Sequence, residues 1–572
     1  AIALRKDASI EKTIAKTDAV LKPYGGVGAY GREDQFSHSF LDSELDQLRA
    51  MASVIPPIFL MVAAFLVNMI LSRLIALERE QIGLLKAVGY GPFDVAAHYG
   101  KMVVIIAIIG LVIGSVFGFW LSRGLTQLYA QFFSFPFLVF SPSPDLYIIA
   151  GGVTVAAGLL GAAKAVLGVV LLPPAVAMQP PAPADYTSVF TRWMKQTRLM
   201  SQLTTMAMRH LLHRPIRALL TIFGTAMPVA LLTTSLFTYD SIDSMIDTIF
   251  FQTERQDATL IFAEETSPWA LHDVAALPGV LRSEPFRATE VIIRKEHRSV
   301  RTEVFGIPAR TELSRILDIE GNPVSPPQDG VMLSERVADK LAVRPGDEIS
   351  LVLLKWNRRE VSVQVTGLTH SLIGLAVFTR LERLNTMIGE GPRISGTRVG
   401  LDSDRLDNIY KIIKRTPAIA SIALSNLSRD KFRETVERNI SISAQVYIVL
   451  AIVITFGVIY NSARIQLSER ARELASLRVF GFTRGEVSRV LMSELAIIVL
   501  IAQPIGWLVG YGFAWSVVQG FESDLFRIPL VIERSTYAIS SLVVLGAALV
   551  SALIVRRRIN RLDLIRVLKT RE

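Results

Sequence analysis

The chain carries, at residues 78–90, the sequence EREQIGLLKAVGY, a charged and amphipathic segment between two long apolar runs. A second version, RARELASLRVFGF, occupies residues 470–482. Residues 392 positions apart correspond, and the register continues into the next apolar run. The matched pairs are Ile82 with Leu474, Leu85 with Leu477, Lys86 with Arg478, Gly89 with Gly481, Gly114 with Gly506, and Gly118 with Gly510. A match over about forty residues with intact spacing indicates an internal duplication.

The composition is that of a membrane protein. Of the 572 residues, 51% are hydrophobic, and the mean hydropathy is +0.41. The sequence has no cysteine, which excludes disulfides, thiol catalysis and thiolate metal sites. The net charge of +10 could indicate a nucleic-acid partner. In a membrane protein such a charge more often reflects basic cytoplasmic loops, so we expect no nucleic acid.

Seven apolar runs are long enough to cross a bilayer, since about 18 apolar residues suffice. They lie at residues 54–71, 102–121, 146–172, 218–237, 444–463, 495–517 and 537–555. A polar region of about 200 residues separates the fourth run from the fifth. Its strand patterns lie at 258–262, 290–294, 300–305, 349–354 and 361–365, and its helical patterns at 334–341 and 406–414. This region is predicted to fold as an α+β domain.

The basic residues predict the orientation in the membrane. Lys and Arg are frequent in segments 73–101, 173–217 and 464–489 and in the C-terminal tail. The alternate connections, 122–145 and 520–536, carry only one and two. The positive-inside rule places the basic segments in the cytoplasm and the polar domain outside. A complete repeat then has four spans and returns to its starting side, so the duplication is parallel.

The predicted fold is a polytopic α-helical membrane protein with a parallel duplication of four-helix units and an extracytoplasmic α+β domain. The first repeat lacks the span that precedes the external domain in the second, so we expect a truncated start that omits one helix and most of an external domain. The expected parts are the end of that first external domain (1–50), a first membrane unit with three helices (51–178), a cytoplasmic proline-rich linker with an amphipathic helix (179–214), the first helix of the second unit (215–240), the external domain (241–443), and the second unit with a basic tail (444–572).

Each charged segment has two apolar residues three positions apart, Ile82 with Leu85 and Leu474 with Leu477. A short interfacial helix with this pattern can dock on a soluble partner. It can also be a solvated loop whose apolar stripe faces the membrane. Because the segment is duplicated in both sequence and topological position, we favour a docking element.

These segments resemble the cytoplasmic segment of FtsX/MacB-type ABC transporter permeases, whose pattern is Glu-Arg-x-(x)-Glu-Ile-Gly-x-Leu-Arg-Ala-Leu-Gly. Other stretches resemble the same family: RHLLHRPIRALL (209–220), GVMLSERVADKL (330–341), RPGDEI (344–349), LDLIRVL (562–568) and a weaker LPPAVAM (172–178). The chain looks like a fused permease with two FtsX domains, similar to membrane subunits of the lipoprotein-release and macrolide-exporter types. The copies are not interchangeable, since Gln81 replaces the usual Glu in one, and Glu473-Leu474-Ala475 replaces Glu-Ile-Gly in the other.

The resemblance implies the membrane subunit of an ATP-driven ABC transporter in the bacterial inner membrane. Closure of a separate ATPase dimer would push on the charged segments, and stiff helices would carry the motion to the external domain. One chain would pair with two ATPase copies, which would bind ATP and Mg. The chain itself would bind no cofactor or metal and would not be an enzyme, and it has no Gly-x-x-x-x-Gly-Lys-Ser/Thr phosphate loop. Paired acids such as Glu264-Glu265 are expected to be solvated.

The implied work is export or extraction of a hydrophobic substrate, such as a lipid, lipoprotein, drug or peptide. Membrane lipid and a periplasmic adaptor or extracytoplasmic enzyme would be further partners. Two other classes stay open. One is a non-transporting regulator that activates an extracytoplasmic enzyme. The other is an ion- or proton-coupled secondary transporter, which predicts inverted repeats and several buried charges that this sequence does not show.

Three sets of residues follow as candidates, none of them catalytic. Those for ATPase coupling are Glu80, Gln81, Ile82, Gly83, Leu85, Lys86, Gly89, Arg472, Glu473, Leu474, Leu477, Arg478 and Gly481. Those for helix packing are Gly110, Gly114, Gly118, Gly506 and Gly510, because small residues let helix backbones approach closely in lipid. The polar residues inside apolar runs are Asn68 and Lys164. Lys164 lies near the expected cytoplasmic end of its span, which favours snorkelling over a substrate or proton path.

Overall fold

The computed structural model describes residues 2, 4–5, 8–24, 26, 28–32, 35–132, 139–170, 173, 175, 208, 211, 215–355, 359–469, 479–520 and 527–559. The chain divides into two compact units, which we describe separately. The α+β unit comprises Ala1–Met51, Phe237–Ser443 and Trp515–Ile532. The membrane unit comprises Ala52–Leu236, Ala444–Ala514 and Glu533–Glu572.

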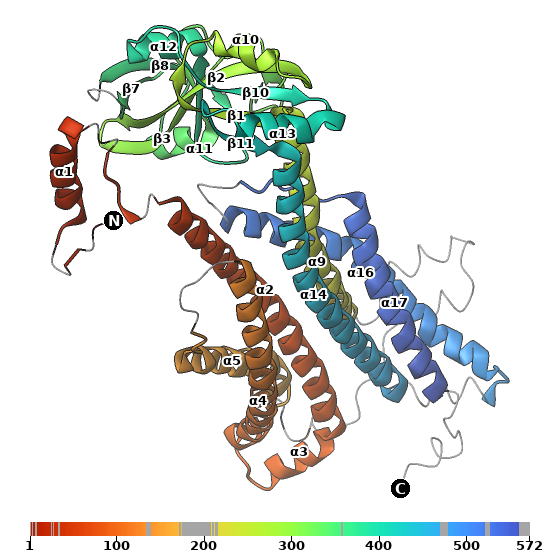
Figure 1. Ribbon diagram of the computed structural model, residues 1–572. Helices are drawn as coiled ribbons and strands as arrows, with labels where there is room; N and C mark the ends of the chain where they lie inside the picture. The colour runs from red at the N-terminus through yellow and green to blue at the C-terminus, as the bar shows by residue number, and fades with distance from the viewer. Residues whose placement is uncertain are drawn as a thin grey trace. The chain divides into compact units, whose positions relative to one another are not determined.

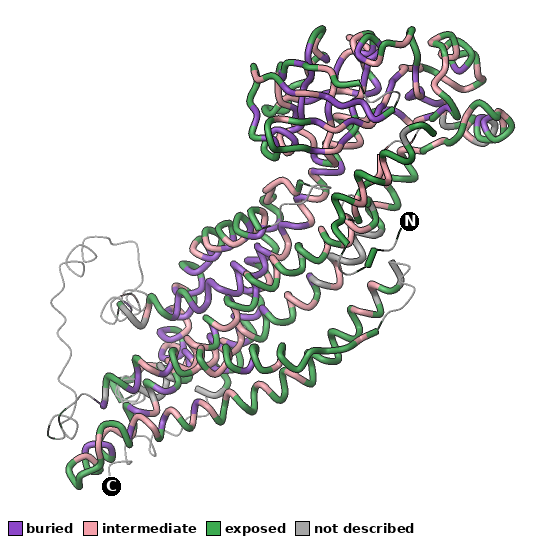
Figure 2. The backbone as a smooth tube through the Cα atoms, turned by 90° about the vertical axis from the view of Figure 1, so that its left-hand side faces the viewer, coloured by how far each residue is buried: buried purple, intermediate pink, exposed green. Residues whose placement is uncertain are grey.

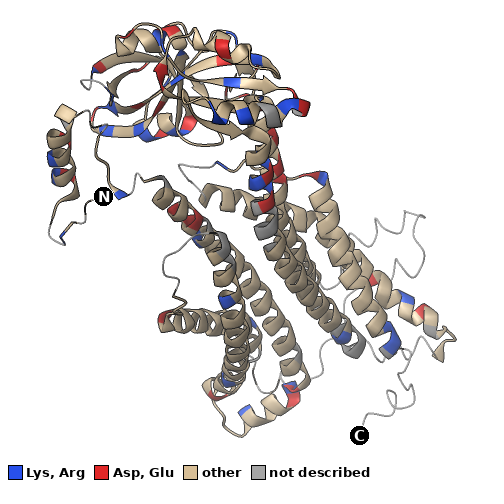
Figure 3. Ribbon diagram, in the orientation of Figure 1, with Lys and Arg blue, Asp and Glu red and all other residues tan. Residues whose placement is uncertain are grey.

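Among the described residues, seven helices are long and apolar enough to cross a membrane, which confirms the seven predicted spans. They are α2 (Phe36–Leu77), α4 (Pro92–Phe132), α5 (Pro144–Val170), α9 (Pro215–Asp247), α14 (Ser425–Glu469), α16 (Arg484–Gly520) and α17 (Arg534–Ile559) (Figure 1). Charged residues are sparse along their apolar stretches (Figure 3). The predicted amphipathic helix of the 179–214 linker lies outside the described residues.

The spans are buried to very different extents. In the most apolar stretch of each, 72% of the residues are buried in α9, against 11% in α4. Helix α9 lies among others: Met227 shares an apolar cluster with Ile58 and Val62 of α2 and Val458 of α14. Figure 2 shows the buried residues of the membrane helices gathered along some helices, while others are exposed along most of their length. Helix α9 is therefore the central helix of the membrane unit.

Two polar groups inside the spans have clear positions. The side-chain amide Nδ2 of Asn68 on α2 donates a hydrogen bond of 2.7 Å to the backbone oxygen of Gly161 on α5. A Cβ at Gly161 would lie 2.3 Å from the backbone oxygen of Ala64, so α2 and α5 approach closely there. Asn68 therefore joins two helices, as polar side chains in membranes commonly do. Lys164 is exposed on α5, which leaves its ammonium free to reach the interface.

The α+β unit contains the predicted strands and helices. Its strands are β1 (Ala258–Thr266), β2 (Val280–Lys295), β3 (Arg298–Ile307), β4 (Ile316–Leu317), β5 (Pro323–Val324), β6 (Val331–Ser334), β7 (Glu348–Leu353), β8 (Glu360–Thr369), β9 (Ala376–Arg380), β10 (Ile394–Leu401) and β11 (Ile419–Leu424). Its other helices are α1 (Ile10–Leu21), α10 (Ala270–Ala275), α11 (Glu335–Leu341), α12 (Leu381–Ile388) and α13 (Leu406–Lys414), with short 3₁₀ turns at Lys22–Tyr24 and Ser403–Arg405.

One long strand, β2, belongs to two sheets at once. Its first half pairs with β10 in a four-stranded sheet of order β11-β1-β10-β2. The two β-α-β units of this sheet, β1-α10-β2 and β10-α13-β11, give a ferredoxin-like arrangement. The second half of β2 pairs with β3 on one side and β7 on the other. The order β2-β3-β9-β6-β8-β7 therefore closes into a small barrel.

The ferredoxin-like sheet with its helices forms one lobe of the unit, and the barrel forms the other. Strand side chains alternate between the two faces of a sheet, so each lobe has an inward face that forms its own apolar core. The barrel interior is filled by branched aliphatic residues, among them Val291, Ile293, Val304, Leu333 and Leu351. The core of the ferredoxin-like lobe forms between its sheet and α13, with Leu260, Val399 and Ile409. The barrel is an insertion between the two β-α-β units of this lobe.

Helices α9 and α14 connect directly to adjacent strands of the ferredoxin-like sheet. Helix α9 continues into a π-helix, Thr248–Thr253, shortly before β1. Helix α14 begins at Ser425, the residue after β11, and β1 pairs with β11. The two helices are also joined to each other, since Arg433 Nη2 lies 3.0 Å from Asp243 Oδ1 and the Arg429 guanidinium lies over the Phe251 ring. Little flexible chain separates these helices from the sheet.

Candidate coupling site

The first charged segment forms helix α3 (Arg79–Ala87), which lies between α2 and α4. Ile82 is only 3% exposed and packs in a cluster with Ile75 of α2, Val95 of α4 and Val166 of α5. Gly83 is buried as well. The prediction that Ile82 and Leu85 form one docking stripe is therefore wrong for Ile82, which anchors α3 to the membrane unit. The i,i+3 pattern correctly marks a helix but does not tell its buried side from its exposed side.

Helix α3 and the adjoining ends of α2, α4 and α5 form what we call a corner of the membrane unit. Two polar contacts hold these helix ends together. Lys86 Nζ donates a hydrogen bond of 2.8 Å to the backbone oxygen of Val170, the last residue of α5. A cation is favourable at a helix C-terminus, where carbonyl groups lack partners. The Tyr99 hydroxyl on α4 donates to Glu78 Oε2 at 2.6 Å. Together with the Ile82 cluster, these contacts join α3 to both α4 and α5.

Helix α3 ends in a glycine turn that fixes the direction of the chain into α4. Gly89 has a φ of +106°, a conformation that disfavours residues with a Cβ. The amide of Tyr90 bonds to the Leu85 oxygen and that of Gly89 to the Lys86 oxygen, which is a Schellman motif. The Gly91 amide then donates to Asp94 Oδ2, which caps the start of α4.

The outward side of this corner carries five large exposed side chains, which we call the first corner surface. Their exposed fractions are 59% for Leu84, 44% for Leu85, 74% for Val88, 55% for Tyr90 and 83% for Phe93. Glu80 and Gln81 are exposed beside them. An apolar group of this kind, held on a rigid support, is typical of an interaction surface. Val88, Tyr90 and Phe93 were missed as candidates, although the i,i+4 spacing of Leu84 and Val88 marks them in the sequence.

The second copy is described only from Val479 onward, so Arg472, Glu473, Leu474, Leu477 and Arg478 lie outside the described residues. The described part repeats the first turn. Gly481 has a φ of +95°. Thr483 and Glu486 form a reciprocal capping box at the start of α16, with a Thr483 amide to Glu486 Oε2 distance of 2.8 Å. Val479 and Phe480 are 71% and 80% exposed, and we call them the second corner surface.

The glycines on α4 and α16 differ in their surroundings. A Cβ built at Gly506 would lie 2.5 Å from Val229 Cβ, and one at Gly510 would lie 2.8 Å from Thr233 Cβ, so α9 lies directly on this face of α16. A Cβ at Gly110, Gly114 or Gly118 would meet no atom of the described residues within 4 Å. Among these five glycines, only Gly506 and Gly510 thus lie at a close helix contact within the described residues.

We expect Gly506→Leu to destabilise the membrane unit by about 1–3 kcal/mol, the usual cost of overpacking a filled site. The substituted side chain would push α9 and α16 apart, because Val229 and the Ala226 carbonyl already occupy its space. Gly114→Leu, at the equivalent position of the first repeat, should cost less than about 0.5 kcal/mol, as a surface substitution does. Thermal unfolding of both variants in detergent checks this, and an equal loss in both would contradict it.

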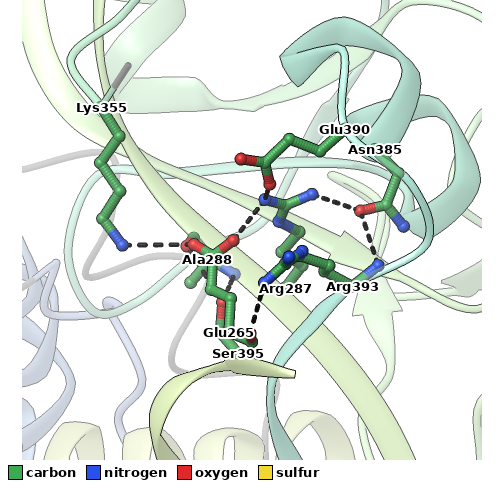
Figure 4. A network of polar contacts seen from close by, with 8 residues as sticks. All are labelled: Glu265, Arg287, Ala288, Lys355, Asn385, Glu390, Arg393 and Ser395. Atoms are coloured by element: carbon green, nitrogen blue, oxygen red, sulfur yellow. Dashed lines mark hydrogen bonds and ion pairs between the residues drawn. The ribbon is translucent and has the colours of Figure 1, made fainter. Parts of the chain in front are cut away.

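A buried network of charges lies in the α+β unit where β2 passes from one sheet to the other (Figure 4). The Arg287 side chain is 1% exposed, and its guanidinium contacts Glu265, Glu390 Oε2 at 2.6 Å and Asn385 Oδ1 at 2.5 Å. Lys355 Nζ lies 3.3 Å from Glu265 Oε1. The expectation that Glu265 is solvated is therefore wrong, since its side chain is 16% exposed and paired. Arg287 and Lys355 thus place two positive charges beside the two carboxylates.

This network joins elements that are far apart in the sequence. Glu265 lies in β1, and Asn385 and Glu390 lie in and after α12. Arg393 reinforces it by donating to the backbone oxygen of Glu265 at 2.9 Å. Its carboxylates contact the Arg287 guanidinium directly, which favours a structural role over catalysis. Within the described residues, no group of three or more His, Asp or Glu side chains could hold a metal ion.

Comparison with known proteins gives a match to both halves of the membrane unit. The family model described as FtsX-like permease C-terminal matches residues 53–174 and again 446–564. Each match contains one charged segment, one corner surface and three spans. No curated protein sequence matches the chain.

Solved structures resemble part of the chain. The extracellular domain of the noncanonic ABC-type transporter YknZ from Gram-positive bacteria is 13% identical, with a TM-score of 0.20, and the match covers 27% of this chain and 87% of that one. The periplasmic region of MacB from Actinobacillus actinomycetemcomitans is 13% identical, with a TM-score of 0.23, and the match covers 33% of this chain and 98% of that one. The repeated family match and the seven candidate spans together show a membrane chain with two FtsX-like permease domains.

Proposed function

We propose that the chain couples two copies of a separate ATPase to work on a hydrophobic substrate at the outer side of the bacterial inner membrane. The observation that carries this proposal is the repeated corner surface. It places large exposed apolar side chains beside the same glycine turn in both repeats. Two such surfaces suit a dimeric partner, with one ATPase copy on each.

The basic residues support the proposed orientation. The corner surfaces lie in segments 73–101 and 464–489, which the positive-inside rule assigns to the cytoplasm, where ATP and Mg are available to the ATPase. The α+β unit would then act on the extracytoplasmic side. A substrate drawn from the outer leaflet, such as a lipid, lipoprotein, drug or peptide, would reach it there, either directly or with an adaptor.

Mechanical transmission is supported by the way the helices meet the sheet. A tilt of α9 or α14 would act on the paired strands β1 and β11, because almost no loop lies between helix and strand. A second link runs through the segment between α16 and α17. The Arg527 guanidinium contacts Glu335 at the start of α11, and the Arg527 amide donates to the Leu372 oxygen at 3.0 Å. The same segment bonds to α9, where Ser241 Oγ donates to the Val531 oxygen at 3.2 Å.

The proposal is tested by the mass of the complex that the full chain forms with its ATPase. We expect native mass spectrometry of the complex purified from its own membrane to give one copy of this chain with two copies of one P-loop ATPase. ATP hydrolysis by that complex should rise when the substrate is added. A stable complex with no ATPase, or with an extracytoplasmic enzyme and no transported molecule, would contradict the proposed transport.

A further inference from the structure

Strand β11 lies at one edge of the ferredoxin-like sheet, where it pairs with β1. The pairing is regular from Ser421 to Leu424, and the amide of Ser425 donates to the Asp257 oxygen just before β1. Successive residues of a strand point their backbone groups to opposite sides, so those of Ile422 and Leu424 point away from β1. Among the described residues, no strand pairs with β11 on that side. The outer edge of β11 is therefore open to a further strand.

The two edges of this sheet differ in how they are protected from pairing. The first half of β2 forms the opposite edge and carries Arg282, Glu284 and Pro285. Charged residues and proline are common means by which proteins keep an edge strand from pairing. Strand β11 has the sequence IASIAL, which contains neither, and its Ser421 and Ala423 are small and exposed. An edge without such protection is a template for strand addition.

The charges beside β11 indicate which kind of strand it would accept. Lys411, Lys414 and Arg415 lie at the end of α13, shortly before β11, and all three are exposed. The described residues give none of the three an ion-pair partner. Residues 408–429 contain no Asp or Glu, and the exposed Glu264 at the adjoining end of β1 offsets one positive charge at most. The surroundings of this edge are therefore basic and suit an acidic segment.

We propose that β11 is a docking strand for an extended, acidic segment of a separate protein, which joins the sheet through backbone hydrogen bonds. The segment has alternating apolar residues, which cover the partly exposed side chains of Ile422 and Leu424, and Asp or Glu beside the basic end of α13. A second copy of this chain fits less well. In an antiparallel pair of two β11 strands, Arg415 of one copy would lie near Arg429 of the other, and like charges across a strand pair are unfavourable. The proposal does not depend on the ATPase or on a transported substrate.

The test measures binding of a fluorescein-labelled peptide, EETVTVTVEE, to the full-length chain in nanodiscs of phosphatidylcholine. The probe has alternating apolar residues and acids at both ends, so it can pair in either direction. We expect saturable binding by fluorescence anisotropy. The basic version KKTVTVTVKK should bind at least about tenfold more weakly, because like charges would meet at the end of α13. The acidic peptide with every central amide methylated should also bind at least about tenfold more weakly, because it cannot donate hydrogen bonds to the edge.

Variants of the chain locate the binding strand. Ile422→Pro removes an N–H that points away from β1, which edge strands tolerate, and should weaken binding of the acidic probe at least about tenfold. Ile422→Val is the matched control, because it keeps that N–H, and should bind within about twofold of the natural chain. On addition of the probe, hydrogen exchange should slow in residues 419–425 and stay unchanged in residues 280–286, on the opposite edge.

Three results would overturn the proposal: no saturable binding of the acidic probe, equal binding of its methylated form, or slowed exchange confined to other parts of the chain. A dimer of the chain that Ile422→Pro dissociates would overturn it in favour of a second copy. The methylated peptide is compared on the natural chain, so the proposal stays testable if Ile422→Pro fails to fold.

Discussion

Replacing Val88 and Phe480 together by aspartate is expected to weaken binding of the ATPase at least about a hundredfold and to abolish substrate-stimulated ATP hydrolysis. The two positions are equivalent in the repeat and are 74% and 80% exposed, so the fold does not need their side chains. In a complex each would face a desolvated apolar contact. A carboxylate buried there without a partner costs several kcal/mol, and about 2.7 kcal/mol already corresponds to a hundredfold loss.

The two single variants show whether the two corner surfaces contribute equally to ATPase binding. The first corner surface has Phe93, whereas the equivalent residue of the second is Gly485. We therefore expect Phe480→Asp to reduce binding more than Val88→Asp, since fewer large side chains remain around it. Leu281→Asp is the matched control, because Leu281 is 75% exposed on the α+β unit. Full ATPase binding by the double variant, measured by co-purification and by biolayer interferometry, would show that the corner surfaces are not the coupling site.

The membrane part of the fold could be predicted from the sequence because its signals are local. A span is a continuous apolar run, and the duplication is a register of residues such as Gly89 and Gly481 whose left-handed conformation requires glycine. The side of α3 that faces the membrane unit could not be predicted from the sequence in the same way. Ile82 and Leu85 are equally apolar, and only the positions of α4 and α5 decide that Ile82 is the buried one.

The internal organisation of the α+β unit could not be predicted, because it depends on contacts between distant residues. The strand pattern of β2 was recognised at 290–294, but nothing local indicates that its first half pairs with β10 and its second half with β3 and β7. Likewise Arg287 contacts residues 98 and 103 positions away. In the sequence it is one arginine among many on a polar domain, and most of these are solvated.

We expect Arg287→Met to destabilise the α+β unit by about 3–5 kcal/mol, the usual cost of removing one partner of a buried ion pair. Methionine keeps the apolar stem but leaves the partly buried Glu265 and Glu390 facing each other without the guanidinium between them. The carbonyl of Asn385 also loses its donor. Because the network lies where β2 changes sheets, its loss should loosen the junction of the two lobes before it loosens the barrel core.

Hydrogen exchange of the full-length chain can show whether the junction of the two lobes loosens before the barrel core. Amides of β1 and α12, which carry or adjoin the contacts of Arg287, should exchange about a hundredfold or more faster in the variant, while those of β6 inside the barrel change less. Arg282→Met is the matched control on the same strand, since Arg282 is half exposed and pairs with Glu312 at the surface. Such a pair contributes about 0–1 kcal/mol. Similar effects of the two substitutions would mean that the buried network does not hold the lobes together, and that the continuous backbone of β2 alone joins them.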